Sequence, residues 1–104
     1  MSDDKSVLTE QQVAEEQLVG WTFADDSLAA KFATGDFATG LGLVNRIGGL
    51  AEETNHHPDL ELSYPEVGVR LSSHDAGGVT GRDIQMARSI SELAAVEGVG
   101  PDQP

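Results

Sequence analysis

The chain of 104 residues contains no cysteine, and it has only six lysines and arginines against 18 aspartates and glutamates. Without cysteine it cannot form a disulfide, a thiolate nucleophile or a thiolate metal site. Its net charge of -12 repels phosphate backbones and anionic lipid surfaces, so we expect no direct binding to nucleic acid or membranes. We interpret the acidity as a solubilising surface that says little about chemistry.

Long apolar runs are missing as well. No segment approaches the roughly 18 apolar residues that a membrane-spanning helix requires. Residues 1–10 lack the basic and apolar regions of a signal peptide. We therefore expect a cytoplasmic protein. The length predicts a single domain over residues 1–104, with residues 1–8 and 98–104 flexible.

Hydrophobic periodicity and capping residues predict the order helix, two strands, helix, two strands, helix. The helices are expected over residues 9–19, from a cap at Asp36 to about Asn55, and from a cap at Thr80 to a stop at Gly98. The strands are expected over residues 21–24, 28–32, 60–64 and 67–71. This order predicts an α+β fold, in which a four-stranded antiparallel sheet carries three helices packed on one face.

The second predicted helix contains four glycines, at positions 40, 42, 48 and 49. Each costs about 1 kcal/mol relative to alanine in a helix, which argues against this element. Length and apolar periodicity still favour a helix. Glycines on one helical face would let a strand or another subunit approach closely.

All three histidines of the chain, His56, His57 and His74, lie between residues 52 and 83. Imidazole has an unperturbed pKa of about 6.5, so this side chain can both donate and accept a proton near neutral pH. The cluster therefore points to proton-transfer chemistry. Strand alternation would place His74 on the face opposite the core, provided that the strand continues that far. The simpler alternative, solvated surface histidines at positions 56 and 57, stays open.

A metal site is the second interpretation, because three imidazoles can bind Zn²⁺ and leave one position open. The chain lacks the HxH and HExxH spacings that are typical of zinc sites. Two carboxylates also have alternative roles. Asp83 can complete a helix cap with Thr80 or orient a histidine, and the two roles are compatible. Glu52, one helical turn before His56, is either solvated or a carboxylate that makes His56 more basic.

A longer pattern of residues runs through this segment and upstream of it. It consists of Glu52, His56-His57-Pro58, Tyr64, Val67-x-Val69-x-Leu71, Ser73-His74-Asp75, Gly78-x-Thr80 and Arg82-Asp83, preceded by Gly20-Trp21, Leu28, Phe32 and Asp36-Phe37. This pattern closely resembles the pterin-4a-carbinolamine dehydratase family over about residues 9–94. One position departs from it, because many family members carry tryptophan where Leu60 stands.

The resemblance implies a hydro-lyase that dehydrates 4a-hydroxytetrahydropterin to quinonoid dihydropterin and so recycles the cofactor of aromatic amino-acid hydroxylases. It implies His56 and His57 as the acid and base pair, His74 as a group that binds or polarises the pterin, and Asp83 as support for a histidine. The residues expected at the substrate are Glu52, Asn55, Pro58, Ser72 and Ser73. The pterin is the substrate, so neither a metal nor an organic cofactor is implied. Family members commonly form homodimers or homotetramers, and we expect the same here.

The same fold also has relatives that are not enzymes. One kind is a dimerisation cofactor of a homeodomain transcription factor, and another is an assembly chaperone of Rubisco. Such chaperones tend to lose the histidine set, which is intact in this chain. A non-enzymatic binding or assembly function is therefore the alternative to the dehydratase. The leucine at position 60 bears on pterin affinity more than on the reaction.

Overall fold

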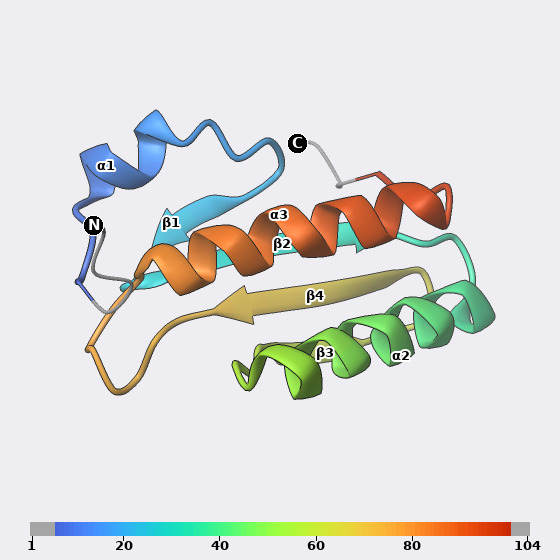
Figure 1. Cartoon of the computed structure of the whole chain (residues 1–104). Coiled ribbons are helices and arrows are strands. Elements are labelled where there is room, and N and C mark those ends of the chain that lie inside the picture. Colours follow the sequence, from blue (N-terminus) through green and yellow to red (C-terminus); the bar gives the residue numbers. More distant parts are fainter. Residues whose placement is uncertain (1–5, 101–104) are drawn as a thin grey trace.

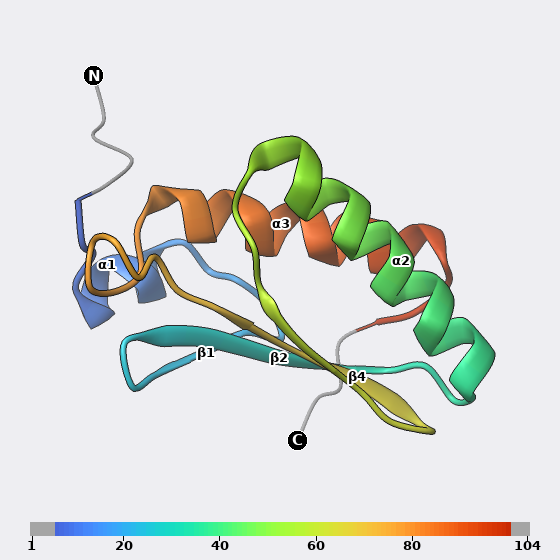
Figure 2. The ribbon, with the colours of Figure 1, turned by 90° about the horizontal axis from the view of Figure 1, so that it is seen from below.

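The computed structural model describes residues 6–100 and confirms the predicted order of elements. The elements are α1 (Glu10–Glu15), β1 (Thr22–Ala24), β2 (Ser27–Ala33), α2 (Phe37–Thr54), β3 (Asp59–Leu62), β4 (Glu66–Leu71) and α3 (Gly81–Val96). The strands form one antiparallel sheet in the order β1-β2-β4-β3. α2 and α3 lie side by side across one face of the sheet, and α1 stands at the end of the same layer (Figures 1 and 2).

The first two strands form the predicted hairpin. Asp25 and Asp26 both adopt positive φ, 53° and 60°, which is the conformation that a tight two-residue hairpin turn requires. The ring of Trp21 meets the ring of Phe32 edge to face, with 6.0 Å between their centroids. Trp21 Nε1 also donates a hydrogen bond of 3.0 Å to Ser91 Oγ on α3. The hairpin is thereby tied to the helix layer above it.

The second helix forms despite its glycines. Asp36 caps it by accepting a hydrogen bond of 2.7 Å from the Thr39 N–H. A Cβ on Gly40 would lie 2.7 Å from Leu62 Cδ1 on β3, so this glycine allows the close approach of a strand that we expected. Asn55 ends the helix in the left-handed conformation, at φ 54° and ψ 39°. That turn determines where the histidines point.

The first helix is shorter than predicted. α1 ends at Glu15, and Gln17 already has a φ of 54°, so the stop predicted at Gly20 is wrong. Thr9 caps the helix within the predicted capping box. The last turn has no basic residue and is followed by Glu16. Negative charge is unfavourable at the carboxyl end of a helix dipole, which explains the early end.

The structure describes only part of the two chain ends that we predicted to be flexible. Residues 1–5 and 101–104 lie outside the described residues. The Leu8 N–H donates to the Val79 carbonyl at 2.8 Å, and the Val99 N–H donates to the Ala94 carbonyl at the same distance. Val99 is buried in the core, and Leu8 packs against it. Leu8 and Val99 therefore contact the rest of the fold, and the flexibility of the chain ends stays a prediction.

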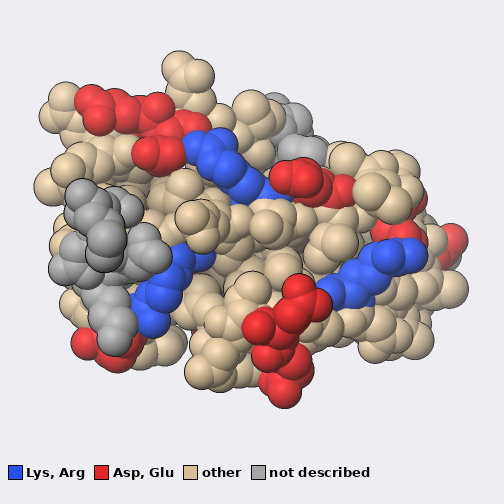
Figure 3. All heavy atoms as spheres, in the orientation of Figure 1, with Lys and Arg blue, Asp and Glu red and all other residues tan. Residues whose placement is uncertain are grey.

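Basic side chains on the helix side of the molecule lie next to acidic ones, as the space-filling view shows (Figure 3). Three ion pairs account for this arrangement: Arg46 with Glu97 at 2.7 Å, Arg82 with Asp75 at 2.7 Å and Arg88 with Glu16 at 2.6 Å. The basic groups on this face therefore form no separate patch. Within residues 6–100, no helix has the length and the apolar character needed to cross a bilayer.

Candidate functional site

The end of α2 and the first turn of α3 bring His56 and Asp83 together. His56 Nε2 lies 2.6 Å from Asp83 Oδ1. The Asp83 side chain is fully buried, and that of His56 is only 12% exposed. A hydrogen bond between such groups is stronger than one in water, because the surroundings screen it less. The carboxylate therefore holds the imidazole in one orientation.

His57 pairs with a different carboxylate and in a different environment. Its Nε2 lies 2.6 Å from Glu52 Oε2, and the two side chains are 54% and 79% exposed. Of the two alternatives for Glu52, the carboxylate beside His56 does not occur in this structure, because Glu52 is largely exposed and pairs with His57. The left-handed turn at Asn55 carries His56 away from the helical face, and Pro58 keeps the helix from continuing. His57 turns back towards α2 instead.

His74 lies in a turn and not on a continuing strand. β4 ends at Leu71, so the strand alternation that we used for His74 does not extend to it. The turn is closed by hydrogen bonds of 2.9 Å from the Ser73 N–H to the Gly78 carbonyl and from the Gly77 N–H to the Ser73 carbonyl. The His74 side chain is exposed, and nothing within residues 6–100 forms a hydrogen bond or an ion pair with it.

The second oxygen of Asp83 is surrounded by donors. Oδ2 accepts hydrogen bonds from Ser73 Oγ at 2.8 Å and from the Thr80 N–H at 2.9 Å. Ser73 Oγ and Thr80 Oγ1 are themselves 2.9 Å apart, and all three side chains are buried. Asp83 thus caps α3 through Oδ2 while Oδ1 contacts His56, so the geometries required by both of its candidate roles occur together.

The other residues predicted at the substrate lie in different surroundings. Asn55 and Pro58 flank the two neighbouring histidines, and Ser72 donates a hydrogen bond of 3.1 Å to the Asp26 carbonyl. Ser73 is only 1% exposed and its hydroxyl bonds within the protein, so the direct substrate contact predicted for it does not fit this structure. β4 ends at Leu71, so the burial of Ser73 belongs to the turn after the strand and does not follow from strand alternation.

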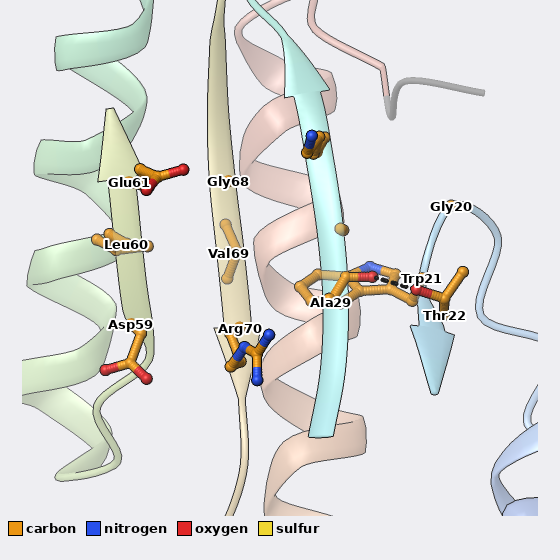
Figure 4. A pocket seen from close by; sticks show the side chains of 12 residues that line it. Gly20, Trp21, Thr22, Ala29, Asp59, Leu60, Glu61, Gly68, Val69 and Arg70 are labelled. Atoms are coloured by element: carbon orange, nitrogen blue, oxygen red, sulfur yellow. Dashed lines mark hydrogen bonds between the residues drawn. The ribbon is translucent and has the colours of Figure 1, made fainter. Parts of the chain in front are cut away.

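A separate hollow of about 820 Å³ lies over the sheet. Its lining includes Trp21, Lys31, Asp59, Leu60, Glu61 and Arg70 (Figure 4). None of the lining residues is a histidine, the side chain suited to proton exchange near neutral pH. Leu60, where many family members carry tryptophan, is half-buried and packs against the core. The histidines predicted to transfer protons therefore lie outside the lining of this hollow.

The arrangement offers two imidazoles on consecutive residues, each bonded through Nε2 to its own carboxylate. One pair is buried and the other is exposed, so the two rings meet different surroundings. Within residues 6–100, no group of three or more histidine, aspartate or glutamate side chains is placed to hold a metal ion. The geometry suits proton transfer by two groups with separate properties.

Comparisons with known proteins point to one family. The protein-family model described as pterin 4 alpha carbinolamine dehydratase matches residues 6–93 of this chain. A protein of Aquifex aeolicus that carries the provisional name pterin-4-alpha-carbinolamine dehydratase is 47% identical over 88 residues, which cover 83% of this chain and 89% of that protein. A protein of Thermomicrobium roseum with the same provisional name is 40% identical over 80 residues, which cover 77% of this chain and 86% of that protein.

A solved structure agrees with these relatives. The crystal structure of a protein from Brucella melitensis named transcriptional coactivator/pterin dehydratase superposes with a TM-score of 0.79 at 35% identity. The match covers 84% of this chain and 97% of the Brucella chain. The fold, the sequence match and the histidine segment agree, and the chain belongs to the pterin-4a-carbinolamine dehydratase family.

Proposed function

We propose that this protein is a hydro-lyase that converts 4a-hydroxytetrahydropterin, such as 4a-hydroxytetrahydrobiopterin, to the quinonoid dihydropterin and water. The observation that carries the proposal is the pair of neighbouring histidines, His56 and His57, each bonded at 2.6 Å to a carboxylate. These residues lie within the part of the chain that matches the family model. In the cell the reaction would recycle the pterin cofactor of an aromatic amino-acid hydroxylase.

The reaction needs two proton transfers and nothing else. One proton must reach the hydroxyl on C4a, so that the C4a–O bond breaks and water leaves. Another must leave N5, so that its electron pair forms the C4a=N5 double bond. A general acid and a general base supply these steps, and each typically contributes about 10²–10⁴-fold to the rate. Atoms and electrons balance without a metal or an organic cofactor, because the pterin itself is the substrate.

The different surroundings of the two histidines support the proposal that one acts as the general acid and the other as the general base. His56 is held by the buried Asp83, whereas His57 pairs with Glu52 in contact with solvent. Titratable groups in unlike environments are the usual way in which one site keeps an acid and a base at the same pH. In this proposal His74, exposed in the turn after β4, binds or polarises the pterin.

The direct test is the rate at which freshly generated 4a-hydroxytetrahydropterin loses water, followed by its ultraviolet absorbance. Wild type, the double variant His56→Ala/His57→Ala and the variant His74→Ala are compared with buffer, after circular dichroism has shown that each is folded. We expect acceleration by wild type, its loss in the double variant, and a raised KM for His74→Ala. A folded wild type that does no better than buffer contradicts the proposal.

The alternative to the dehydratase is a binding or assembly function without catalysis. The name of the Brucella protein includes transcriptional coactivator as well as pterin dehydratase. A scaffold has no need for a histidine held by a buried carboxylate, which favours the enzyme here. The same assay separates the two, because a folded but inactive wild type would favour the binding function.

We further propose that the protein acts in the cytoplasm as a homodimer or homotetramer. Phe37 and Leu41 support this proposal, because both are exposed apolar side chains on α2 and are available for a contact between subunits. Sedimentation velocity measures the assembly directly. A protein that stays monomeric across the concentration range would contradict this part of the proposal.

A further inference from the structure

We infer that Ser73 and Thr80 are positioning residues, which fix Asp83 so that His56 carries its proton on Nε2 and presents Nδ1 to the substrate. The final step, contact with a substrate, rests on the proposed function. The protonation of the ring does not, and it can be measured in the protein alone. Ser73 was expected to touch the substrate, so this inference gives it a different role.

The direction of each hydrogen bond around Asp83 follows from the number of protons available. The Thr80 N–H can only donate, and it lies 2.9 Å from Asp83 Oδ2. Ser73 gives its one hydroxyl proton to the same oxygen at 2.8 Å. Ser73 Oγ must then accept from the Thr80 hydroxyl, 2.9 Å away. The bonds therefore run in one direction, from Thr80 through Ser73 to Asp83.

The ionised state of Asp83 determines which nitrogen of His56 carries the proton. Both bonds to Asp83 Oδ2 come from donors, so the carboxylate acts there as an acceptor. An ionised carboxylate has no proton to give, and His56 Nε2, 2.6 Å from Oδ1, must be the donor. In a neutral imidazole the lone pair then lies on Nδ1.

Nδ1 is also the ring nitrogen that a ligand can reach. No group within residues 6–100 bonds to it, and it is not among the buried polar atoms that lack a partner. The His56 side chain is 12% exposed. A neutral His56 can therefore accept a proton on Nδ1 from a bound molecule, and its protonated form can return one.

Ser73 also anchors the turn that carries His74. Its N–H donates to the Gly78 carbonyl at 2.9 Å, and its carbonyl accepts from the N–H groups of Ala76 at 3.0 Å and Gly77 at 2.9 Å. One buried residue thus connects the carboxylate behind His56 with the backbone of His74. Loss of the Ser73 hydroxyl should change the orientation of His56 without removing any group that contacts the substrate.

The first experiment measures the tautomer of His56 by ¹⁵N-edited NMR of the histidine rings, at a pH where the ring is neutral. We expect Nε2–H in wild type. In Asp83→Asn the amide oxygen must occupy the Oδ2 position, because the Ser73 hydroxyl and the Thr80 N–H both donate there. The amide NH₂ then faces Nε2 and moves the ring proton to Nδ1, as a comparable substitution does in a catalytic triad.

Either of two results would overturn the inference. One is a neutral wild-type ring protonated on Nδ1, and the other is an Asp83→Asn ring that keeps its proton on Nε2. Assignment of the His56 signals uses His56→Gln. These spectra need no substrate, so they remain decisive if the protein proves not to be a dehydratase.

The second experiment removes the supporting hydroxyls one at a time. We expect Ser73→Ala and Thr80→Ala to lower kcat by about 10- to 100-fold with little change in KM, as loss of a supporting hydrogen bond does elsewhere. The His56 ring should also lose its single tautomer. Ser73→Thr and Thr80→Ser, which keep the hydroxyls, should restore both readouts.

Two matched variants control for the loss of a hydroxyl as such. Ser63→Ala removes a hydroxyl that donates to the Glu66 carbonyl at the β3–β4 turn, and Thr9→Ala removes the equivalent helix cap from α1. Neither substitution should change the NMR signals of the His56 ring nitrogens. If Ser73→Ala does not fold, Ser73→Cys keeps the volume with a weaker donor and is measured in the same way. Wild-type spectra and kcat in a folded Ser73→Ala or Ser73→Cys would refute the positioning role.

Discussion

Removal of the two carboxylates that contact histidines should have very unequal effects on stability. Asp83→Ala and Glu52→Ala each delete one partner of a 2.6 Å contact to an imidazole. The two contacts have the same length and differ in burial. Comparison of the two variants therefore shows whether burial or contact distance determines how much each pair contributes to the free energy of unfolding.

The structure gives the size of each effect. Asp83→Ala leaves the Ser73 hydroxyl, the Thr80 N–H and the His56 ring without their acceptor in a fully buried site. Leaving one buried donor unsatisfied costs about 1–3 kcal/mol, and breaking a buried pair costs about 3–5 kcal/mol. We expect a loss of about 3–5 kcal/mol, because the three donors share one carboxylate and their costs do not simply add.

Glu52→Ala should cost far less. Both partners of the Glu52–His57 pair are more than half exposed, so water can replace either of them. Exposed pairs contribute about 0–1 kcal/mol, and we expect a loss within that range. The deleted residue also lies in the last turn of α2, where a negative charge is unfavourable to the helix dipole, and this reduces the loss further.

The assay is urea unfolding at neutral pH, followed by circular dichroism and by Trp21 fluorescence and fitted with one slope for all variants. Asp83→Asn serves as the matched control, because it keeps the size of the side chain and its contacts at the Oδ2 position. Its loss should lie between those of the two alanine variants. Equal losses of unfolding free energy for Asp83→Ala and Glu52→Ala would refute the claim that burial makes the Asp83–His56 pair the more stabilising one.

Three smaller predictions concern α2. Gly48→Ala, at a position with nothing near its would-be Cβ, should raise the free energy of unfolding by up to about 1 kcal/mol in thermal or urea unfolding. Gly40→Ala should be at least about 1 kcal/mol less favourable than Gly48→Ala, because its Cβ would lie 2.7 Å from Leu62 Cδ1, and Leu62→Ala should relieve the difference. The Thr39 N–H that bonds to Asp36 lowers the pKa of this carboxyl below 3.8, so its stabilising effect is present above that pH and fades as pH falls through the lowered folded-state pKa. The advantage of wild type over Asp36→Asn should therefore shrink in acid, and an advantage that does not change with pH would contradict this.

Much of the fold follows from local rules that the sequence displays directly. Strand alternation, the caps at Asp36 and Thr80 and the turn residues at positions 25 and 26 all lie within a few residues of what they specify. The early end of α1 could not be predicted in the same way. Glycine at position 20 is a common kind of helix stop, but acidic residues around position 16 end the helix first. Hydrophobic periodicity shows which residues share a helical face, and it does not show where charge ends the helix.

The site is harder to predict, because its contacts depend on one backbone conformation. The helix ends where we predicted, near Asn55, so helical spacing does not reach His56, and the left-handed turn at Asn55 reverses which histidine faces Glu52. Asn is among the residues that most readily adopt this conformation. Assigning this conformation to Asn55, at the predicted helix end, would have shown that the helical spacing between Glu52 and His56 does not apply.

The helix cap and the histidine support are a single structure in this protein. A capping residue at the start of α3 needs only one carboxylate oxygen, and Asp83 uses Oδ2 for that purpose. The other oxygen is then held at a fixed place by the helix itself, and His56 meets it there. A glutamate at position 83 could still complete a capping box, but its longer side chain would move the oxygen that faces His56. Asp83→Glu should therefore preserve α3 while lowering the activity of a dehydratase, a combination that a purely structural role for Asp83 would not produce.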